Sequence, residues 1–179
     1  MTYLTDAEVE APLEAPEQAT RTGRRDHAIM ETFIATGLRA GELTALTDQD
    51  RKLTKPSHLV VRGKGRKDRI TPLNRATVTT LGRWRDENPN QAGASPLFSA
   101  QGSTRPTSVD AIAARIHAHI TTAEATCHTL TGKNISPHTL RHTCAMRTLA
   151  AGINNTTIAL WLGHESTEPP KRIFMPTSA

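Results

Sequence analysis

The sequence predicts a mainly α-helical domain with a small antiparallel β-sheet, which places it in the α+β class. Alanine, the strongest helix former, supplies 23 of the 179 residues. In several segments the apolar residues recur at the three- and four-residue spacing of a helix. One segment, residues 57–73, instead has the pattern of a β-hairpin around a glycine turn.

We expect three parts: an acidic N-terminal arm (1–20), a main domain (21–168) and a C-terminal tail (169–179). The first 20 residues form either a short helix or an arm, with Thr5 as a helix cap and Glu8 completing a capping box. The main domain begins with a helix over residues 24–36 that ends at Gly37. A second helix follows directly, with an apolar face made of Leu38, Leu43 and Leu46.

The β-hairpin has a short β-branched run before Gly63-Lys64-Gly65, which forms the turn. Residues 89–107 and 126–135 are rich in loop-forming residues and predict loops. Ser136 followed by Pro137 is a strong helix start, and Asn154 or Asn155 caps the last helix. The remaining predicted helices cover residues 74–88, 108–120, 136–151 and 154–163.

The charge of the chain is uneven. The 22 Lys and Arg residues outnumber the 17 Asp and Glu residues, so the net charge is +5. Residues 1–20 carry five carboxylates and no Lys or Arg, and the remaining 22 basic and 12 acidic residues give +10. A basic body predicts a polyanionic partner, with nucleic acid first. A basic surface without such a partner is the alternative.

Membrane and secretory classes are not expected. The sequence has no run of 18 apolar residues and no N-terminal signal pattern. Its two cysteines, Cys127 and Cys144, make no disulfide framework and predict reduced thiols. These features favour a cytoplasmic protein.

The first motif with chemical potential surrounds Arg39. This arginine follows the break at Gly37 and begins a helix, where a guanidinium and free backbone N–H groups can bind phosphate together. Glu42 lies one turn later and can orient Arg39. The alternative is an ordinary surface ion pair.

The second motif is the tip of the predicted hairpin, which carries five cations and one carboxylate. Its glycines let the backbone approach a ligand closely. A basic β-ribbon of this kind is suited to contact phosphates or a DNA groove, and a solvated turn is the alternative. The cations are Arg62, Lys64, Arg66, Lys67 and Arg69.

The third motif pairs His138 with Arg141 on one helix face, near a helix N-terminus where anions are favoured. An imidazole beside a guanidinium supplies proton transfer and charge stabilisation, which phosphoryl chemistry needs. A zinc site made of His138, His142 and Cys144 is the alternative. It lacks a second spaced ligand pair, and the arginine would repel the metal.

His164 follows the glycine that ends the last helix, where a histidine more often forms a helix-end hydrogen bond than acts as a catalyst. The other histidines show no convincing partners in the sequence. They are His27, His58, His117, His119 and His128.

Together and in this order, the motifs resemble the catalytic domain of the tyrosine recombinases, or phage-type integrases. The family pattern has T-G-L-R-x-x-E-L, then G-K-G in a hairpin, then H-x-L-R-H-T and finally L-G-H. The resemblance extends over residues 2–168 and is greatest to integrases of mobile elements. Its motif positions here are Arg39, Lys64, His138, Arg141 and His164.

The resemblance implies that DNA is broken and rejoined without a metal or nucleotide cofactor. Arg39 and Arg141 would clamp the scissile phosphate, and Lys64 would protonate the leaving 5′-oxygen. His138 and His164 would complete the pocket, with His138 as a candidate for proton transfer. The residues expected to contact DNA are Arg62, Arg66, Lys67 and Arg69.

The resemblance also implies a nucleophile that this sequence lacks. In the family a tyrosine in a T-T-x-x-Y pattern, nine residues after the L-G-H histidine, attacks the phosphorus. Here that position is Ile173, and the one tyrosine in the chain is Tyr3. We therefore expect this chain to be unable to cleave DNA alone.

The tail has a genetic interpretation. One allowed set of codons for residues 169–179, preceded by one added A, reads Thr-Thr-Lys-Ala-Tyr-Leu-Tyr-Ala-Asp-Leu-Ser. This restores the family pattern with a tyrosine at position 173. We interpret the tail as aberrant, the result of a single-base deletion near codon 168 or 169 that truncated the chain. Its prolines disfavour a long helix: Pro169, Pro170 and Pro176.

Three functional hypotheses arise from these observations. The chain is a recombinase domain that cannot cleave alone, a non-catalytic DNA-binding module, or a degenerate remnant of a mobile-element integrase. The expected partners are double-stranded DNA and intact recombinase protomers, with no membrane, metal or other cofactor. The expected location is the cytoplasm, at the nucleoid in a bacterial host.

Overall fold

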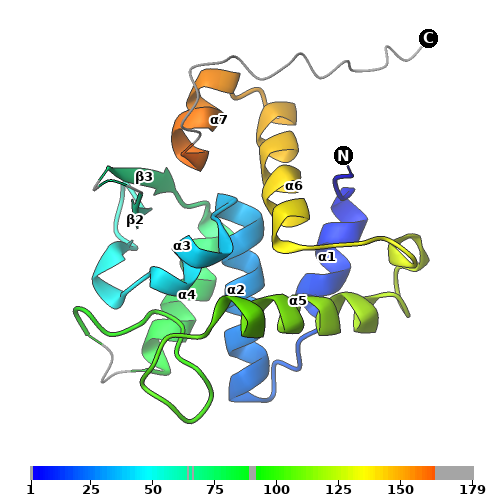
Figure 1. The fold of residues 1–179 in the computed structure, drawn as a ribbon, viewed down its shortest axis with the longest axis horizontal. Coiled ribbons are helices and arrows are strands. Elements are labelled where there is room, and N and C mark those ends of the chain that lie inside the picture. Colours follow the sequence, from blue (N-terminus) through cyan, green and yellow to red (C-terminus); the bar gives the residue numbers. More distant parts are fainter. Residues whose placement is uncertain (1, 64, 66, 89–91, 164–179) are drawn as a thin grey trace.

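The computed structural model describes residues 2–63, 65, 67–88 and 92–163. Helices surround α2, and a three-stranded sheet lies to one side of it (Figure 1). The predicted mainly helical class with a small antiparallel sheet is confirmed. The helices are α1 (Asp6–Glu14), α2 (Arg21–Thr36), α3 (Ala40–Ala45), α4 (Arg75–Asp86), α5 (Val109–Ala123), α6 (Pro137–Ala150) and α7 (Asn155–Leu162).

The sheet consists of β1 (Arg51–Lys52), β2 (His58–Arg62) and β3 (Asp68–Pro72). Its order is β1-β2-β3 and both pairings are antiparallel, so the predicted hairpin is confirmed. Leu59 and Val61 point into the core, while Ile70 on β3 is 59% exposed. Strand β3 packs against α7, which brings the hairpin to the end of that helix.

The core lies around α2, which packs against α4 and α6, while α1 packs against α5. The helix predicted over residues 24–36 buries Ala28, Ile29, Phe33 and Ile34, and Leu38, Leu43 and Leu46 are also buried. Within the described part of the chain, no helix is long and apolar enough to cross a membrane.

The helix ends form where local sequence signals predict them. Ser136 caps α6 with Pro137 in the first turn, and Asn154, rather than Asn155, caps α7. Gly37 and Gly163 end α2 and α7 with φ of 61° and 67°, in the left-handed region that favours glycine. The two helix ends meet, because Gly37 lies against the side chain of Leu162.

The N-terminal segment is a helix in the structure and not an extended arm. Thr5 and Glu8 form the predicted capping box of α1. Leu4, Val9 and Leu13 belong to the hydrophobic core. The buried Glu8 carboxylate lies 2.5 Å from Lys133 Nζ, which ties α1 to the loop before α6. Residues 6–14 are therefore an integral part of the fold.

The Glu8–Lys133 pair makes the free energy of unfolding depend on pH. Burial raises the pKa of Glu8, but hydrogen bonds from Lys133 and the Thr5 backbone lower it to about 2, against an ordinary value of 4.5. Because the folded pKa is the lower one, the stabilisation is complete above pH 4.5 and is lost as pH falls towards 2. We expect Glu8→Gln to reduce the free energy of unfolding at pH 7 by about 2 kcal/mol. Urea unfolding at pH 7 and pH 3 should show that the variant differs less from wild type in acid.

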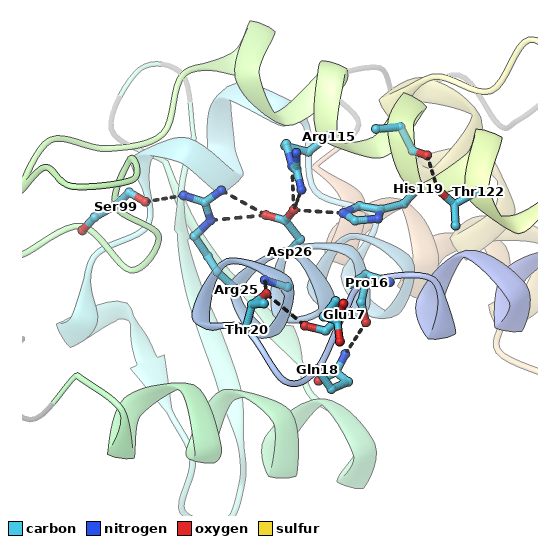
Figure 2. Close-up of polar contacts among 12 residues, drawn as sticks. Pro16, Glu17, Gln18, Thr20, Arg25, Asp26, Ser99, Arg115, His119 and Thr122 are labelled. Carbon is cyan, nitrogen blue, oxygen red and sulfur yellow. Dashed lines mark hydrogen bonds and ion pairs between the residues drawn. The ribbon is translucent and has the colours of Figure 1, made fainter.

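A second buried carboxylate corrects the expectation for His119. Asp26, only 1% exposed, accepts hydrogen bonds from Arg25 and Arg115, and His119 Nε2 lies 2.9 Å from its Oδ2 (Figure 2). The partners come from α2 and α5, 93 positions apart, so no local spacing in the sequence reveals the pair. His119 thus has a clear partner, and the group joins α5 to α2.

Candidate active site

Three arginine side chains meet at the C-terminal end of α7. The last carbonyls of a helix have no partner within the helix and form the negative end of its dipole. Arg69 Nε donates to the Trp161 carbonyl at 2.8 Å, and Arg141 Nη2 donates to that of Leu162 at 2.7 Å. Arg39 Nη2 donates to the Gly163 carbonyl at 3.2 Å. Three elements, α3, α6 and β3, therefore deliver one guanidinium each to this point.

Arg141 is the buried member of this group. It lies one turn into α6, where Leu140 anchors the helix in the core, and it is 7% exposed. Its Nη1 donates to the Gly37 carbonyl at 2.6 Å, so the side chain joins the ends of α2 and α7. Burial, followed by repulsion from Arg39 and Arg69, lowers the pKa of Arg141 to about 10. The group is still charged at neutral pH.

Arg39 is the accessible member. It is the N-cap residue of α3, and its side chain is 51% exposed. Glu42 accepts from the Arg39 backbone N–H at 2.8 Å and from Nη1 at 3.2 Å, the orientation predicted from their spacing. The guanidinium is thus held at the rim of the site but remains open to solvent.

Arg69 is turned inward and does not extend from the hairpin surface. Its Nη1 and Nη2 each donate to one oxygen of Glu42 at 2.8 Å, and its side chain is 12% exposed. The strand geometry explains the orientation, because Arg69 lies opposite the buried Val61 and the side chains alternate along β3. The structure places Arg69 beside the other two arginines.

This arrangement carries excess positive charge. Among the described residues, Glu42 is the one carboxylate that contacts these arginines, through Arg39 and Arg69. Burial raises the pKa of Glu42, but Arg69 and Arg39 lower it by more, so the net change is a lowering. Glu42 is therefore ionised at neutral pH and offsets only one of the three charges. Such a site favours an anion with several acceptor oxygens, such as a phosphodiester.

The two histidines of α6, His138 and His142, form no hydrogen bond with the arginine cluster among the described residues, and His142 instead contacts Tyr3. His138 is exposed on the first turn of α6, and the ring of His142 packs edge-on against that of Tyr3 at 6.1 Å. Burial is the main cause that lowers the pKa of His142, and the nearby His138 also lowers it. The Cys144 thiol instead faces α2, 3.6 Å from the Ala35 carbonyl. His142 and Cys144 therefore point to different neighbours, which disfavours the zinc alternative.

The hairpin cations differ in their surroundings. Arg62 is 55% exposed and lies 3.4 Å from Asp50, and Lys67 is exposed. The other predicted positions lie outside the described residues, and so does the interpreted tail. These positions are Lys64, Arg66, His164 and Ile173.

Sequence reasoning missed the bond between Glu42 and Arg69 and the role of the α7 carbonyls. The contacting residues are 27 and 92 positions apart, so helical spacing gives no signal. Strand alternation could have found Arg69, because it places residues 69 and 71 on one face, and Thr71 also donates to the Trp161 carbonyl.

Gly37 lies where the ends of α2 and α7 meet the middle of α6, and its substitution should destabilise the fold. An added Cβ would lie 2.5 Å from Leu162 Cδ2 and 3.2 Å from Cys144 Cβ, at a φ of 61°. We expect Gly37→Ala to lower the free energy of unfolding by about 3 kcal/mol. Gly152→Ala is the matched control, because its φ is 89° and nothing lies within 4 Å. If urea unfolding shows the same loss of unfolding free energy for both variants, close packing at Gly37 is unimportant.

Solved structures of recombinases share the fold of this chain. The crystal structure of XerA recombinase has the same fold, with a TM-score of 0.79 and 29% sequence identity, over 93% of this chain and 57% of that one. XerH site-specific recombinase bound to its difH substrate also shares the fold, with a TM-score of 0.76 and 22% identity, over 93% and 48% of the two chains. The fold is that of a site-specific recombinase domain.

Similarity in sequence identifies the family of this chain. Residues 2–172 match the phage integrase family, and the chain belongs to it. It is 43% identical to the integrase/recombinase y4rC of Sinorhizobium fredii, over 93% of this chain and 49% of that protein. It is 36% identical to the tyrosine recombinase XerC of Pelobacter propionicus, over 92% and 52%. The chain spans about half the length of these relatives.

Proposed function

We propose that this chain is a recombinase domain that holds a phosphate of double-stranded DNA but supplies no nucleophile. The observation that carries the proposal is the arginine cluster at the end of α7. Arg141 is fixed by two backbone carbonyls, and Arg39 is half exposed at the rim. Among the described residues Glu42 is the one carboxylate in contact with these arginines, so the cluster attracts a phosphodiester.

In this proposal Arg141 and Arg39 bind the non-bridging oxygens of the scissile phosphate. Family resemblance assigns His138 and His164 to the same pocket, with His138 as a candidate for proton transfer. It assigns Lys64 to protonation of the leaving 5′-oxygen. The exposed Arg62 and Lys67, with Arg66, would contact neighbouring phosphates and position the duplex, which is a sequence-independent role.

Two further observations support DNA as the partner. Similar structures include XerH bound to difH and the Tn1549 transposon integrase in complex with circular intermediate DNA. The net charge outside residues 1–20 is strongly positive. A protein that binds DNA in this way would act in the cytoplasm, at the nucleoid in a bacterial host.

The residue at position 173 favours a second form of the proposal. Ile173 has no hydroxyl group, so a polypeptide of this sequence would occupy recombination sites as a DNA-binding module. An intact recombinase protomer in the same assembly could then supply the tyrosine. Both forms share the phosphate pocket and differ only in the partner protein.

The test combines binding with a covalent assay. The chain should bind a 30-base-pair duplex and form no covalent adduct with a nicked suicide substrate on a denaturing gel. Arg39→Gln should weaken binding about tenfold and lower the salt slope by about one, because one phosphate contact is lost. Arg85→Gln is the matched control. Arg85 lies in the last turn of α4, and that end of the helix is away from α7 (Figure 1). A covalent complex formed by this chain alone would contradict the missing nucleophile, and equal affinities of the two variants would contradict the pocket.

A further inference from the structure

We infer that Arg69 is a positioning residue that occupies Glu42 and thereby keeps Arg39 free to bind phosphate. The inference rests on the proposed function, because it concerns the same pocket. It assigns Arg69 a role through Arg39 rather than through DNA.

The first step is the competition for one carboxylate. Glu42 Oε1 accepts from Arg69 at 2.8 Å and from the Arg39 side chain at 3.2 Å. Oε2 accepts from Arg69 at 2.8 Å and from the Arg39 backbone N–H at 2.8 Å. Arg69 therefore holds the carboxylate in the parallel two-bond geometry that is the strongest for this pair. The Arg39 side chain has one longer bond.

The second step is the difference in burial between the two arginines. The side chains of Arg69 and Glu42 are each 12% exposed, whereas that of Arg39 is 51% exposed. The shielded pair is screened less by water than the pair at the rim. Glu42 is thus directed towards Arg69. The Arg39 guanidinium makes one bond to Glu42 and one to the Gly163 carbonyl, both at 3.2 Å, and among the described residues its other N–H groups remain for a ligand.

The third step is the effect of removing Arg69. Arg39 and Glu42 lie three positions apart on one helical turn, so the freed carboxylate can turn to Arg39 and form two bonds with it. A phosphate would then have to displace Glu42 from Arg39. The end of α7 keeps a partner, because Thr71 Oγ1 also donates to the Trp161 carbonyl at 3.0 Å.

The test is a double-mutant cycle on duplex DNA affinity. In the wild-type background, Arg69→Gln should weaken binding of a 30-base-pair duplex about tenfold and lower the salt slope by about one. In the Glu42→Gln background, the same substitution should change affinity less than about threefold, because no carboxylate is left to capture Arg39. Arg85→Gln controls for the loss of one positive charge.

Two outcomes overturn the inference. If Arg69 contacts phosphate directly, or only ties β3 to α7, Arg69→Gln weakens binding equally in both backgrounds. If it does not weaken binding in the wild-type background, Arg69 does not protect Arg39. Failure of the proposed function looks different, because Arg39→Gln then leaves affinity unchanged. Thermal unfolding shows whether each variant folds. Should Arg69→Gln fail to fold, Arg69→Lys replaces it, with about threefold weaker binding expected only when Glu42 is present.

Discussion

Replacement of residues 169–179 by Thr-Thr-Lys-Ala-Tyr-Leu-Tyr-Ala-Asp-Leu-Ser is expected to convert a chain that forms no covalent DNA adduct into one that does. The replacement places a phenol hydroxyl at position 173, nine residues after His164. If Arg39 and Arg141 bind the scissile phosphate as proposed, a tyrosine held beside it would attack the phosphorus in an effectively unimolecular reaction and displace the 5′-oxygen. A denaturing gel of a nicked suicide substrate would show a slower band that protease removes.

The matched control is the same replacement tail with Phe in place of its first Tyr. It keeps the length and nearly the shape of the tail and removes only the hydroxyl, so no adduct should form. A replaced chain that binds DNA but forms no adduct would show that the pocket cannot support cleavage. Sequencing of the gene tests the origin of the tail separately. Codons that cannot encode Thr-Thr-x-x-Tyr in the other frame would exclude a single-base deletion.

Arg141→Ala is expected to have the second largest effect, because it removes a buried residue that serves both the fold and the pocket. The substitution leaves the carbonyls of Gly37 and Leu162 without their guanidinium partner. An unpaired buried carbonyl is unfavourable, although relief of the repulsion with Arg39 and Arg69 offsets part of the loss. We expect the free energy of unfolding to fall by about 3 kcal/mol and duplex affinity to fall more than tenfold.

Arg147→Ala on the same helix is the control, since Arg147 is 39% exposed and its ion pair with Asp6 lies on the surface. It should change the free energy of unfolding by less than about 1 kcal/mol.

In a mixed assembly with an intact recombinase, Arg141→Ala should abolish cleavage at the pocket of this chain. Cleavage that persists there would show that Arg141 does not hold the scissile phosphate.

Much of the fold could be predicted because its signals are local. Thr5 with Glu8, Ser136 with Pro137, and Gly163 each mark a helix end within a few residues, and the structure confirms them. The orientation of Arg39 by Glu42 was predictable for the same reason, because both lie on one helical turn.

The remainder of the site depends on which face a residue presents and on contacts distant in sequence. On β3 the apolar Ile70 is exposed, while Arg69 and Thr71 face the protein. This reverses the alternation that hydrophobicity alone suggests. The contact of His119 with Asp26 likewise requires α5 to cross α2, which no sequence pattern specifies. The residues that sequence reasoning missed are therefore those whose contacts depend on how elements distant in sequence pack together.

The carbonyl groups at the end of α7 also affect the entropy of binding. The Leu162 and Gly163 carbonyl oxygens accept hydrogen bonds from Arg141 and Arg39, as the oxygens of a phosphate would. The arginine rotamers are thus restricted during folding, before any ligand arrives. A long, flexible guanidinium side chain otherwise loses rotational freedom when it binds. For the phosphate proposed to bind here, the backbone of α7 would hold the arginine side chains in place beforehand, and this preorganisation would leave more of the interaction energy for affinity.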